Sequence, residues 1–524
     1  MRAYGDRDLF KRYKSRFIVA PILLLAICIP AMMANLQAVV LVAAVWGIWH
    51  ALMQTYGFLR IYDAKVASFA NATRRLDLAM CLSWFAAAVL FSDNRMAMLL
   101  DFYYQSGGML LPSATVYSAR ILCGLTAATV TTLFAVNLVR AWRIGSPPNP
   151  VKLILMLTSF SFYWYTNVAV VNILVGLAMF EIFHDVQYLA IVWLFNRNKV
   201  EKDKTVVGFT RFIFRRSGAL LGVYLGLIFA YGGLRYVEHG LTSGAFRSLM
   251  TGLLATSGLM HFYFDGFIWK VRESSTAKSL GIKCGQKKKI QVPGLVHSLK
   301  WGLFILPVGL LTLAQQKTAP SELERLECLA ASLPSHCETH HSLGFTLHEN
   351  GMIDQAIHHY RIALQQRPEF VDAHVNLATA LRDTRQNEEA LEHFNEAIRL
   401  DPVCVTAHNN MGNLLAEDGL YSDAEHPLRL AIKYAPQSLE SHNNLGRVLA
   451  RQGRLMSAES QFRKSLDIDP NHVIANYNLG NVLVEQGNLA EASLYFRRAL
   501  AINPAFTDAR RKLQQVHHVQ RNRG

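Results

Sequence analysis

The chain has 524 residues, of which 51% are hydrophobic, and a formal net charge of +15. The charge does not indicate a nucleic-acid partner, because much of the Lys and Arg lies in short loops between apolar runs, where the positive-inside rule places it. A signal peptide does not explain the apolar start, since apolar runs recur over the first 315 residues, and the seven cysteines lack metal-type spacing.

Apolar runs of about 18 or more residues predict transmembrane helices. The first 315 residues hold nine such runs, which predicts a polytopic helical bundle in a lipid bilayer. The expected spans are 17–35, 37–58, 77–93, 117–139, 150–168, 170–195, 217–235, 247–269 and 297–315.

Basic residues gather at the N-terminus and in the loops after the second, fourth, sixth and eighth of these spans. The positive-inside rule therefore predicts that the N-terminus and these loops are cytoplasmic. Nine crossings place the C-terminal region on the opposite side, which is the periplasm if the protein belongs to a bacterial inner membrane. An error of one span in the count would reverse this orientation.

Three of the predicted spans carry a histidine at a comparable depth. His50, His184 and His261 precede a basic residue at the cytoplasmic end of their helices by ten, thirteen and nine residues, and each residue adds about 1.5 Å of rise. Ionisable residues inside a membrane are costly and indicate function. Polar side chains accompany them: Glu181, Asp185, Asp265, Gln54, Gln187 and Tyr188.

One interpretation is a metal site within the membrane, with His50, His184, His261, Glu181, Asp185 and Asp265 as ligands. Gln54, Gln187 and Tyr188 would orient these ligands. Imidazoles with carboxylates suit iron, with copper, zinc or haem as alternatives, and Glu181 and His184 have the i, i+3 spacing of di-iron bundles. The other interpretations are hydrogen bonds between helices and a proton relay or transport site.

Histidines clustered in membrane helices look like those of integral-membrane iron enzymes such as desaturases, hydroxylases and the bacterial carotene-cleaving oxygenases. That resemblance implies an oxidoreductase or oxygenase that acts on a lipid-like substrate. The chain departs from the desaturase pattern, because it has no His-x-x-His-His box, and the substrate is not specified.

A pattern with a period of 34 residues fills the C-terminal third of the chain. Each unit has a Leu-Gly-like pair, then a small residue, an aromatic or large apolar residue, another small residue and a proline. The five units are Leu343-Gly344, Ala356, Tyr360, Ala363, Pro368; Leu377-Ala378, Ala390, Phe394, Ala397, Pro402; Met411-Gly412, Ala424, Leu428, Ala431, Pro436; Leu445-Gly446, Ala458, Phe462, Ser465, Pro470; and Leu479-Gly480, Ala492, Phe496, Ala499, Pro504.

This pattern resembles the tetratricopeptide repeat (TPR), in which each unit is a helix–turn–helix. The resemblance implies an α-solenoid with a concave binding surface. Residues 505–521 are expected to form a polar capping helix.

An asparagine recurs every 34 residues, directly before the residue pair that opens each of the second to fifth units: Asn376, Asn410, Asn444 and Asn478. In some TPR families, notably that of O-linked N-acetylglucosamine transferase, such a ladder binds the backbone of an extended peptide. An amide donates and accepts hydrogen bonds at once, as a peptide unit does. The alternative is that asparagine is simply common at this position.

The sequence thus predicts an all-α protein with three parts: a polytopic membrane domain (1–316), a linker (317–336) and a TPR superhelix with its capping helix (337–521). The expected function is that of a membrane-anchored protein that binds an extended peptide or protein partner through the TPR groove. A membrane metal-dependent oxidoreductase is the alternative, and a transporter or proton-relay protein is a further one.

Overall fold

The computed structural model describes residues 14–34, 36–66, 70–170 and 319–523, with short pieces among 179–201 and 306–315. Every regular element bounded within residues 14–170 and 319–523 is a helix, so the predicted all-α class is confirmed. The chain divides into two compact units, Met1–Pro334 and Ser335–Gly524. The domain limits expected at 316/317 and 336/337 stay predictions.

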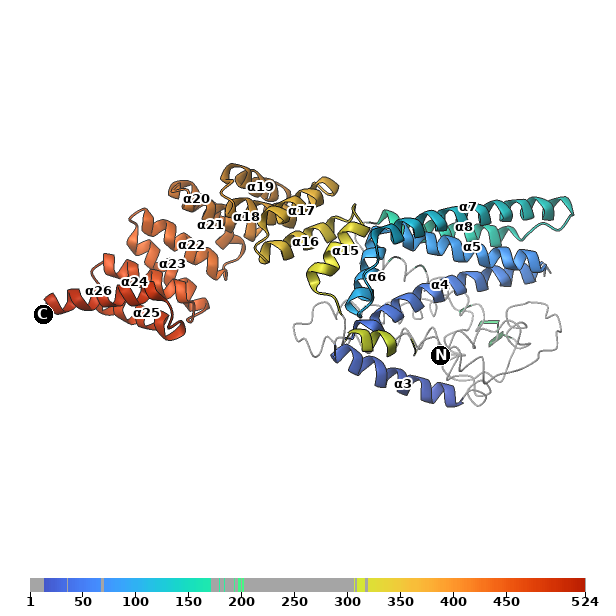
Figure 1. Ribbon diagram of the computed structural model, residues 1–524, viewed down its shortest axis with the longest axis horizontal. Helices are drawn as coiled ribbons and strands as arrows, with labels where there is room; N and C mark the ends of the chain where they lie inside the picture. Colours follow the sequence, from blue (N-terminus) through green and yellow to red (C-terminus); the bar gives the residue numbers. More distant parts are fainter. Residues whose placement is uncertain are drawn as a thin grey trace. The chain divides into compact units, whose positions relative to one another are not determined.

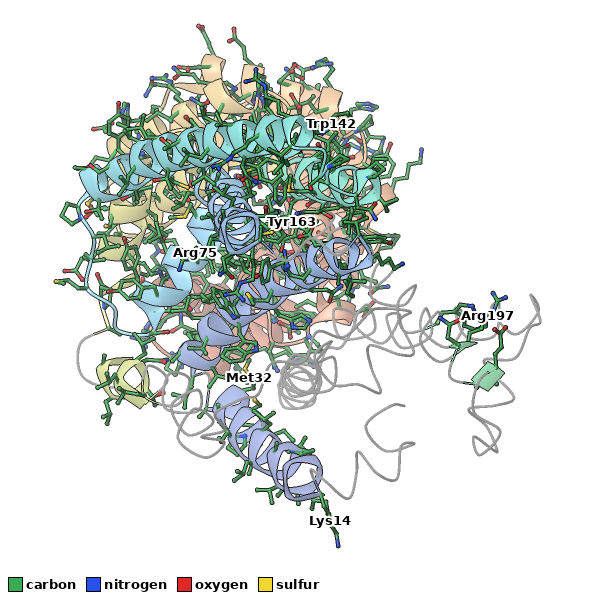
Figure 2. The ribbon with its side chains drawn as sticks, turned by 90° about the vertical axis from the view of Figure 1, so that its right-hand side faces the viewer. Lys14, Met32, Arg75, Trp142, Tyr163 and Arg197 are labelled. Atoms are coloured by element: carbon green, nitrogen blue, oxygen red, sulfur yellow. The ribbon has the colours of Figure 1, made fainter. Side chains whose placement is uncertain are left out.

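The first unit contains long helices that pack side by side (Figure 1). Helix α4 contacts α5, α6 and α8, and α5 also lies along α7. Figure 2 labels Tyr163, which lies among the helices and is buried, and Trp142, which lies on α7 and is exposed. The described helices are α3 (Lys14–Met33), α4 (Gln37–Lys65), α5 (Asn71–Leu90), α6 (Asp93–Gln105), α7 (Ser113–Arg143), α8 (Pro150–Trp164), the π-helical turn η1 (Tyr165–Ala169) and α15 (Glu322–Ser332).

Among the described residues, α4 and α7 are long and apolar enough to cross a bilayer. Helices α5 and α6 together would make a third crossing, but the chain bends by 85° between them. The count of nine spans is therefore not confirmed. The spans expected at 217–235 and 247–269 lie outside the described residues, as do nearly all of 170–195 and part of 297–315.

A cluster of four charges lies inside the first unit. Lys152 Nζ is 2.9 Å from Asp63 Oδ2 and 2.7 Å from Asp77 Oδ2, and Arg60 pairs with both carboxylates. The Lys152, Asp63 and Asp77 side chains are at most 1% exposed. Two positive and two negative charges balance, which is the condition under which buried ions are tolerated. The cluster joins α4, α5 and α8.

Replacement of Lys152 by methionine should destabilise the protein by about 3–5 kcal/mol, because two buried carboxylates would share a single cation. The double variant K152M/D77N restores charge balance and should recover a large part of this loss. Thermal unfolding followed by circular dichroism in one buffer measures both variants. Equal destabilisation in the single and double variants would contradict this account.

The second unit is a stack of helix pairs followed by one further helix (Figure 1, yellow to red). In each pair we call the earlier helix the first helix and the later one the second helix. The pairs are α16 (Cys337–Glu349) with α17 (Ile353–Gln366), α18 (Val371–Asp383) with α19 (Asn387–Leu400), α20 (Val405–Glu417) with α21 (Tyr421–Tyr434), α22 (Leu439–Arg451) with α23 (Leu455–Ile468), and α24 (Val473–Glu485) with α25 (Leu489–Ile502), before α26 (Thr507–Arg523).

Within a pair, a glycine on the first helix lets an aromatic ring of the second helix approach its backbone. A Cβ atom placed on Gly480 would lie 2.6 Å from Cε1 of Phe496, and Phe496 is fully buried. The second pair has Ala378 at this position, opposite the buried Phe394. These contacts are the pattern of small and aromatic residues that the sequence repeats every 34 residues.

The turn within each pair requires a residue of positive φ, because the chain must reverse directly after a helix. Glycine supplies it at Gly351, Gly419, Gly453 and Gly487, with φ between 76° and 83°. The second pair instead holds Arg385 at φ 61°. A side chain in this left-handed region costs roughly 1–2 kcal/mol.

Arg385→Gly should therefore stabilise the array by up to about 1 kcal/mol, since glycine adopts this φ without strain. Gly453→Ala, the matched reverse change, should cost about 1 kcal/mol, because open space surrounds Gly453 and only the backbone conformation changes. Hydrogen exchange of the amides in α18–α19 and α22–α23 reports each local opening free energy. Stabilisation of the array by Gly453→Ala would show that φ is not the deciding factor.

Candidate peptide-binding groove

The first helices form the inner layer of the array. Successive first helices contact one another along the whole array, from α16 with α18 to α22 with α24, and α24 also contacts α26. Elements on the inner side of a superhelix lie closer together than those on the outer side, and the inner, concave side is the binding surface of such arrays. The predicted asparagines all lie on first helices.

Each predicted asparagine donates a side-chain hydrogen bond to the preceding repeat. Asn376 Nδ2 lies 2.9 Å from His341 Nε2, Asn444 Nδ2 lies 3.1 Å from Asn409 Oδ1, and Asn478 Nδ2 lies 3.0 Å from Asn443 Oδ1. Asn410 Nδ2 reaches Thr379 Oγ1 at 3.4 Å. The asparagines therefore form a ladder of bonds between adjacent repeats.

Burial lowers the pKa of His341, although the Asp372 carboxylate opposes the shift. The neutral ring can thus accept the hydrogen bond from Asn376 through Nε2. A carboxamide has two N–H groups and a carbonyl oxygen, and the ladder bond uses one N–H. Because all four asparagines are half-buried, the ladder orients them without enclosing them.

The sequence pattern missed the residues that accept these bonds. Asn409 and Asn443 lie one position before ladder residues and are themselves 34 residues apart, so the period alone could have indicated them. Asn413 extends the polar lining, because its Oδ1 accepts a bond of 2.9 Å from Arg447 Nη2. The amide-lined surface is therefore wider than the four predicted positions.

A second periodic position on the first helices serves the loops between repeats. The side chains at this position donate to the carbonyl oxygen of the proline that ends the preceding repeat. His374 reaches Pro368 at 2.8 Å, and the equivalent residues do the same: His408 with Pro402 at 3.1 Å, His442 with Pro436 at 3.1 Å, and Asn476 with Pro470 at 3.1 Å. Asparagine can replace histidine here because both donate one N–H from a similar place.

The metal site predicted in the membrane bundle is described only in part. His50 and Gln54 lie on α4, where His50 is 9% exposed. Among the described residues, no group of three or more His, Cys, Asp or Glu side chains is arranged to hold a metal. The site stays a prediction, because its other members lie outside the described residues: His184, His261, Glu181, Asp185, Asp265, Gln187 and Tyr188.

Comparison with protein families identifies the array. Residues 347–403 and 375–438 match one family model described as tetratricopeptide repeat, and residues 437–505 match a second with the same description. Residues 347–505 are tetratricopeptide repeats. The pattern expected from the sequence in this region is confirmed, and the TPR array is suited to protein–protein interaction.

Several solved structures are similar to part of the chain. Pseudomonas aeruginosa pilF is 23% identical, with 36% of this chain and 85% of that chain covered and a TM-score of 0.34. YrrB, a TPR protein with an unusual peptide-binding site, is 21% identical (36% and 96% covered, TM-score 0.30), and the type IV pilus biogenesis factor PilW is 20% identical (35% and 89% covered, TM-score 0.32). The comparison with curated proteins found no match to the sequence of the chain.

Proposed function

We propose that the TPR array binds an extended segment of a partner polypeptide along its asparagine ladder, and that the first unit anchors the array in a lipid bilayer. The observation that carries the proposal is the ladder itself. Asn376, Asn444 and Asn478 are each held by a hydrogen bond from Nδ2 to the preceding repeat, so their amides are fixed in place before a ligand arrives. Such preorganisation reduces the entropy cost of binding.

An extended peptide offers one N–H and one C=O per residue, and both need partners once they leave water. A row of fixed carboxamides supplies both kinds of partner. Recognition through the main chain places few demands on the sequence of the ligand. The proposed partner is therefore a segment without its own secondary structure, which binds the inner surface of the array as a strand.

The exterior of the first unit supports the proposed anchor. Helix α7 exposes large apolar side chains on most of its turns, including Leu122 at 67% and Leu125 at 64% exposure. Only 11% of its most apolar 18-residue window is buried. Apolar residues on this scale fit hydrocarbon as their surroundings, and the arginines in the last turn of α7 fit the headgroup region.

The double variant N444A/N478A should weaken peptide binding roughly tenfold to a hundredfold, since two hydrogen bonds of about 0.5–1.5 kcal/mol each would be lost. The ligand is a peptide selected from a displayed random library on the full-length protein, and fluorescence anisotropy measures its Kd. N350A/N471A is the matched control, because both residues are exposed and lie outside the ladder. This control should bind as the wild type does.

A backbone N-methylated version of the same peptide separates main-chain from side-chain recognition. Methylation removes N–H donors and keeps the side chains, so binding through the ladder should be lost. Undiminished binding of the methylated peptide, or equal Kd values for the two double variants, would refute the proposed binding mode.

Our second proposal concerns the predicted membrane site of His50, His184 and His261, with iron as the favoured metal. The burial of His50 within α4 supports it, since ionisable residues inside a membrane are costly and indicate function. Elemental mass spectrometry of the purified protein, with an absorption spectrum for haem, should show a near-stoichiometric metal that the triple alanine variant lacks. A folded wild-type protein without metal or haem would contradict it.

A further inference from the structure

Two histidine pairs join the first and second helices of the first two repeats. His340 Nδ1 lies 3.1 Å from His359 Nδ1, and His374 Nδ1 lies 3.0 Å from His393 Nδ1. The partners in each pair are nineteen residues apart, so the same geometry recurs after one repeat. His340 and His374 are buried, and their partners are half-buried.

In a neutral histidine, the bond made by Nε2 determines whether Nδ1 carries a hydrogen or a free lone pair. The carbonyl oxygen of Pro368 can only accept, so His374 Nε2 must carry the hydrogen of their 2.8 Å bond. A neutral His374 then presents a bare lone pair at Nδ1. On the other side of the pair, His393 Nε2 lies 3.9 Å from a Glu389 carboxylate oxygen. The bond from His374 Nε2 to the Pro368 carbonyl oxygen is the arrangement that orients metal-binding histidines, whereas the Glu389 oxygen lies beyond hydrogen-bond distance of His393 Nε2.

The half-buried member of each pair has a lowered pKa. Burial and the neighbouring His340 lower the pKa of His359 to about 4, and burial and His374 likewise lower the pKa of His393. Neutral imidazole is the form that binds metals. Two rings whose Nδ1 atoms face each other cannot both be protonated there without repulsion.

We propose that the His340–His359 pair and the His374–His393 pair each chelate one zinc-like divalent transition metal ion through their two Nδ1 atoms. The hydrogen that the two Nδ1 atoms of a pair share in the present hydrogen bond would move to Nε2 of the same ring, so that both Nδ1 atoms present a lone pair to the ion. Two nitrogens that are each about 2.0–2.1 Å from a tetrahedral zinc lie about 3.3–3.4 Å apart. The Nδ1 atoms of the two pairs are 3.1 and 3.0 Å apart, so each pair would need to open only slightly to hold the ion. Water completes the coordination of each ion. This site is separate from the asparagine ladder and from the histidines predicted in the membrane bundle.

The other repeats provide natural controls. In the third repeat, Pro427 occupies the position of His393, and Nδ1 of His408 is buried without a hydrogen-bond partner. In the fourth, the carboxamide of Gln461 lies 2.8 Å from His442 Nδ1. Gln461 preserves the hydrogen bond to Nδ1 of the first-helix histidine, but it lacks the second imidazole that would bind the metal. The proposed chelation is thus confined to the first two repeats.

The test measures Zn²⁺ binding to the full-length protein, without a histidine tag, by isothermal titration calorimetry. The variant H359Q/H393Q gives both pairs the composition of the fourth repeat and should bind two fewer zinc ions than the wild type. Q461H creates a third pair with His442 and should bind one more. Zinc should also raise the thermal midpoint of the wild type more than that of H359Q/H393Q.

The same number of zinc ions and the same Kd in the wild type and in H359Q/H393Q would overturn the proposal. The proposal would also be overturned if H359Q/H393Q bound fewer zinc ions but Q461H bound no additional one. In that case the loss of zinc in H359Q/H393Q would be attributed to altered folding. The histidines of the membrane site stay intact in both variants, so zinc bound there cancels in the comparison.

Discussion

The close approach of an aromatic ring to a glycine backbone is the contact on which the geometry of the array depends. Phe462 against Gly446 and Phe496 against Gly480 are fully buried, and a Cβ on either glycine would lie less than 3 Å from the ring. This contact fixes the angle at which the two helices of a pair cross. Equivalent positions of successive repeats are therefore aligned along the array. The asparagine ladder and the row of histidines that donate to the proline carbonyl oxygens both follow from that alignment.

The first unit follows a different principle. Helix α7 exposes large apolar side chains, while ions that neutralise one another, with Lys152 between Asp63 and Asp77, lie inside the unit beside its buried apolar cluster. In water such ions would be better solvated at the surface. This combination of exposed leucines and buried charges supports the proposal that the first unit lies in a bilayer.

The period of 34 residues predicted the repeats because each aromatic contact joins residues that are close in sequence. The period of 34 residues could mark Asn409 and Asn443 as equivalent positions, but not as the acceptors of the ladder bonds, because that pairing depends on the rotation between repeats. Asn478 reaches Asn443 across 35 residues, and no pattern within one repeat encodes that distance. Hydropathy likewise could not detect the 85° bend between α5 and α6, or the shortness of the apolar part of α3, which contains Pro21 and Pro30.

The ladder bonds also give the array a polarity. Every one of them points from a later repeat to an earlier one, so the carboxamides of Asn376, Asn444 and Asn478 are all turned the same way. A peptide strand has a direction too, because its N–H and C=O groups alternate in a fixed order from the N-terminus to the C-terminus. A row of identically turned amides distinguishes the two orientations of a strand. If the groove binds a strand as proposed, the ladder would set which end of the segment lies nearest the first repeat, even where it does not distinguish one side chain from another.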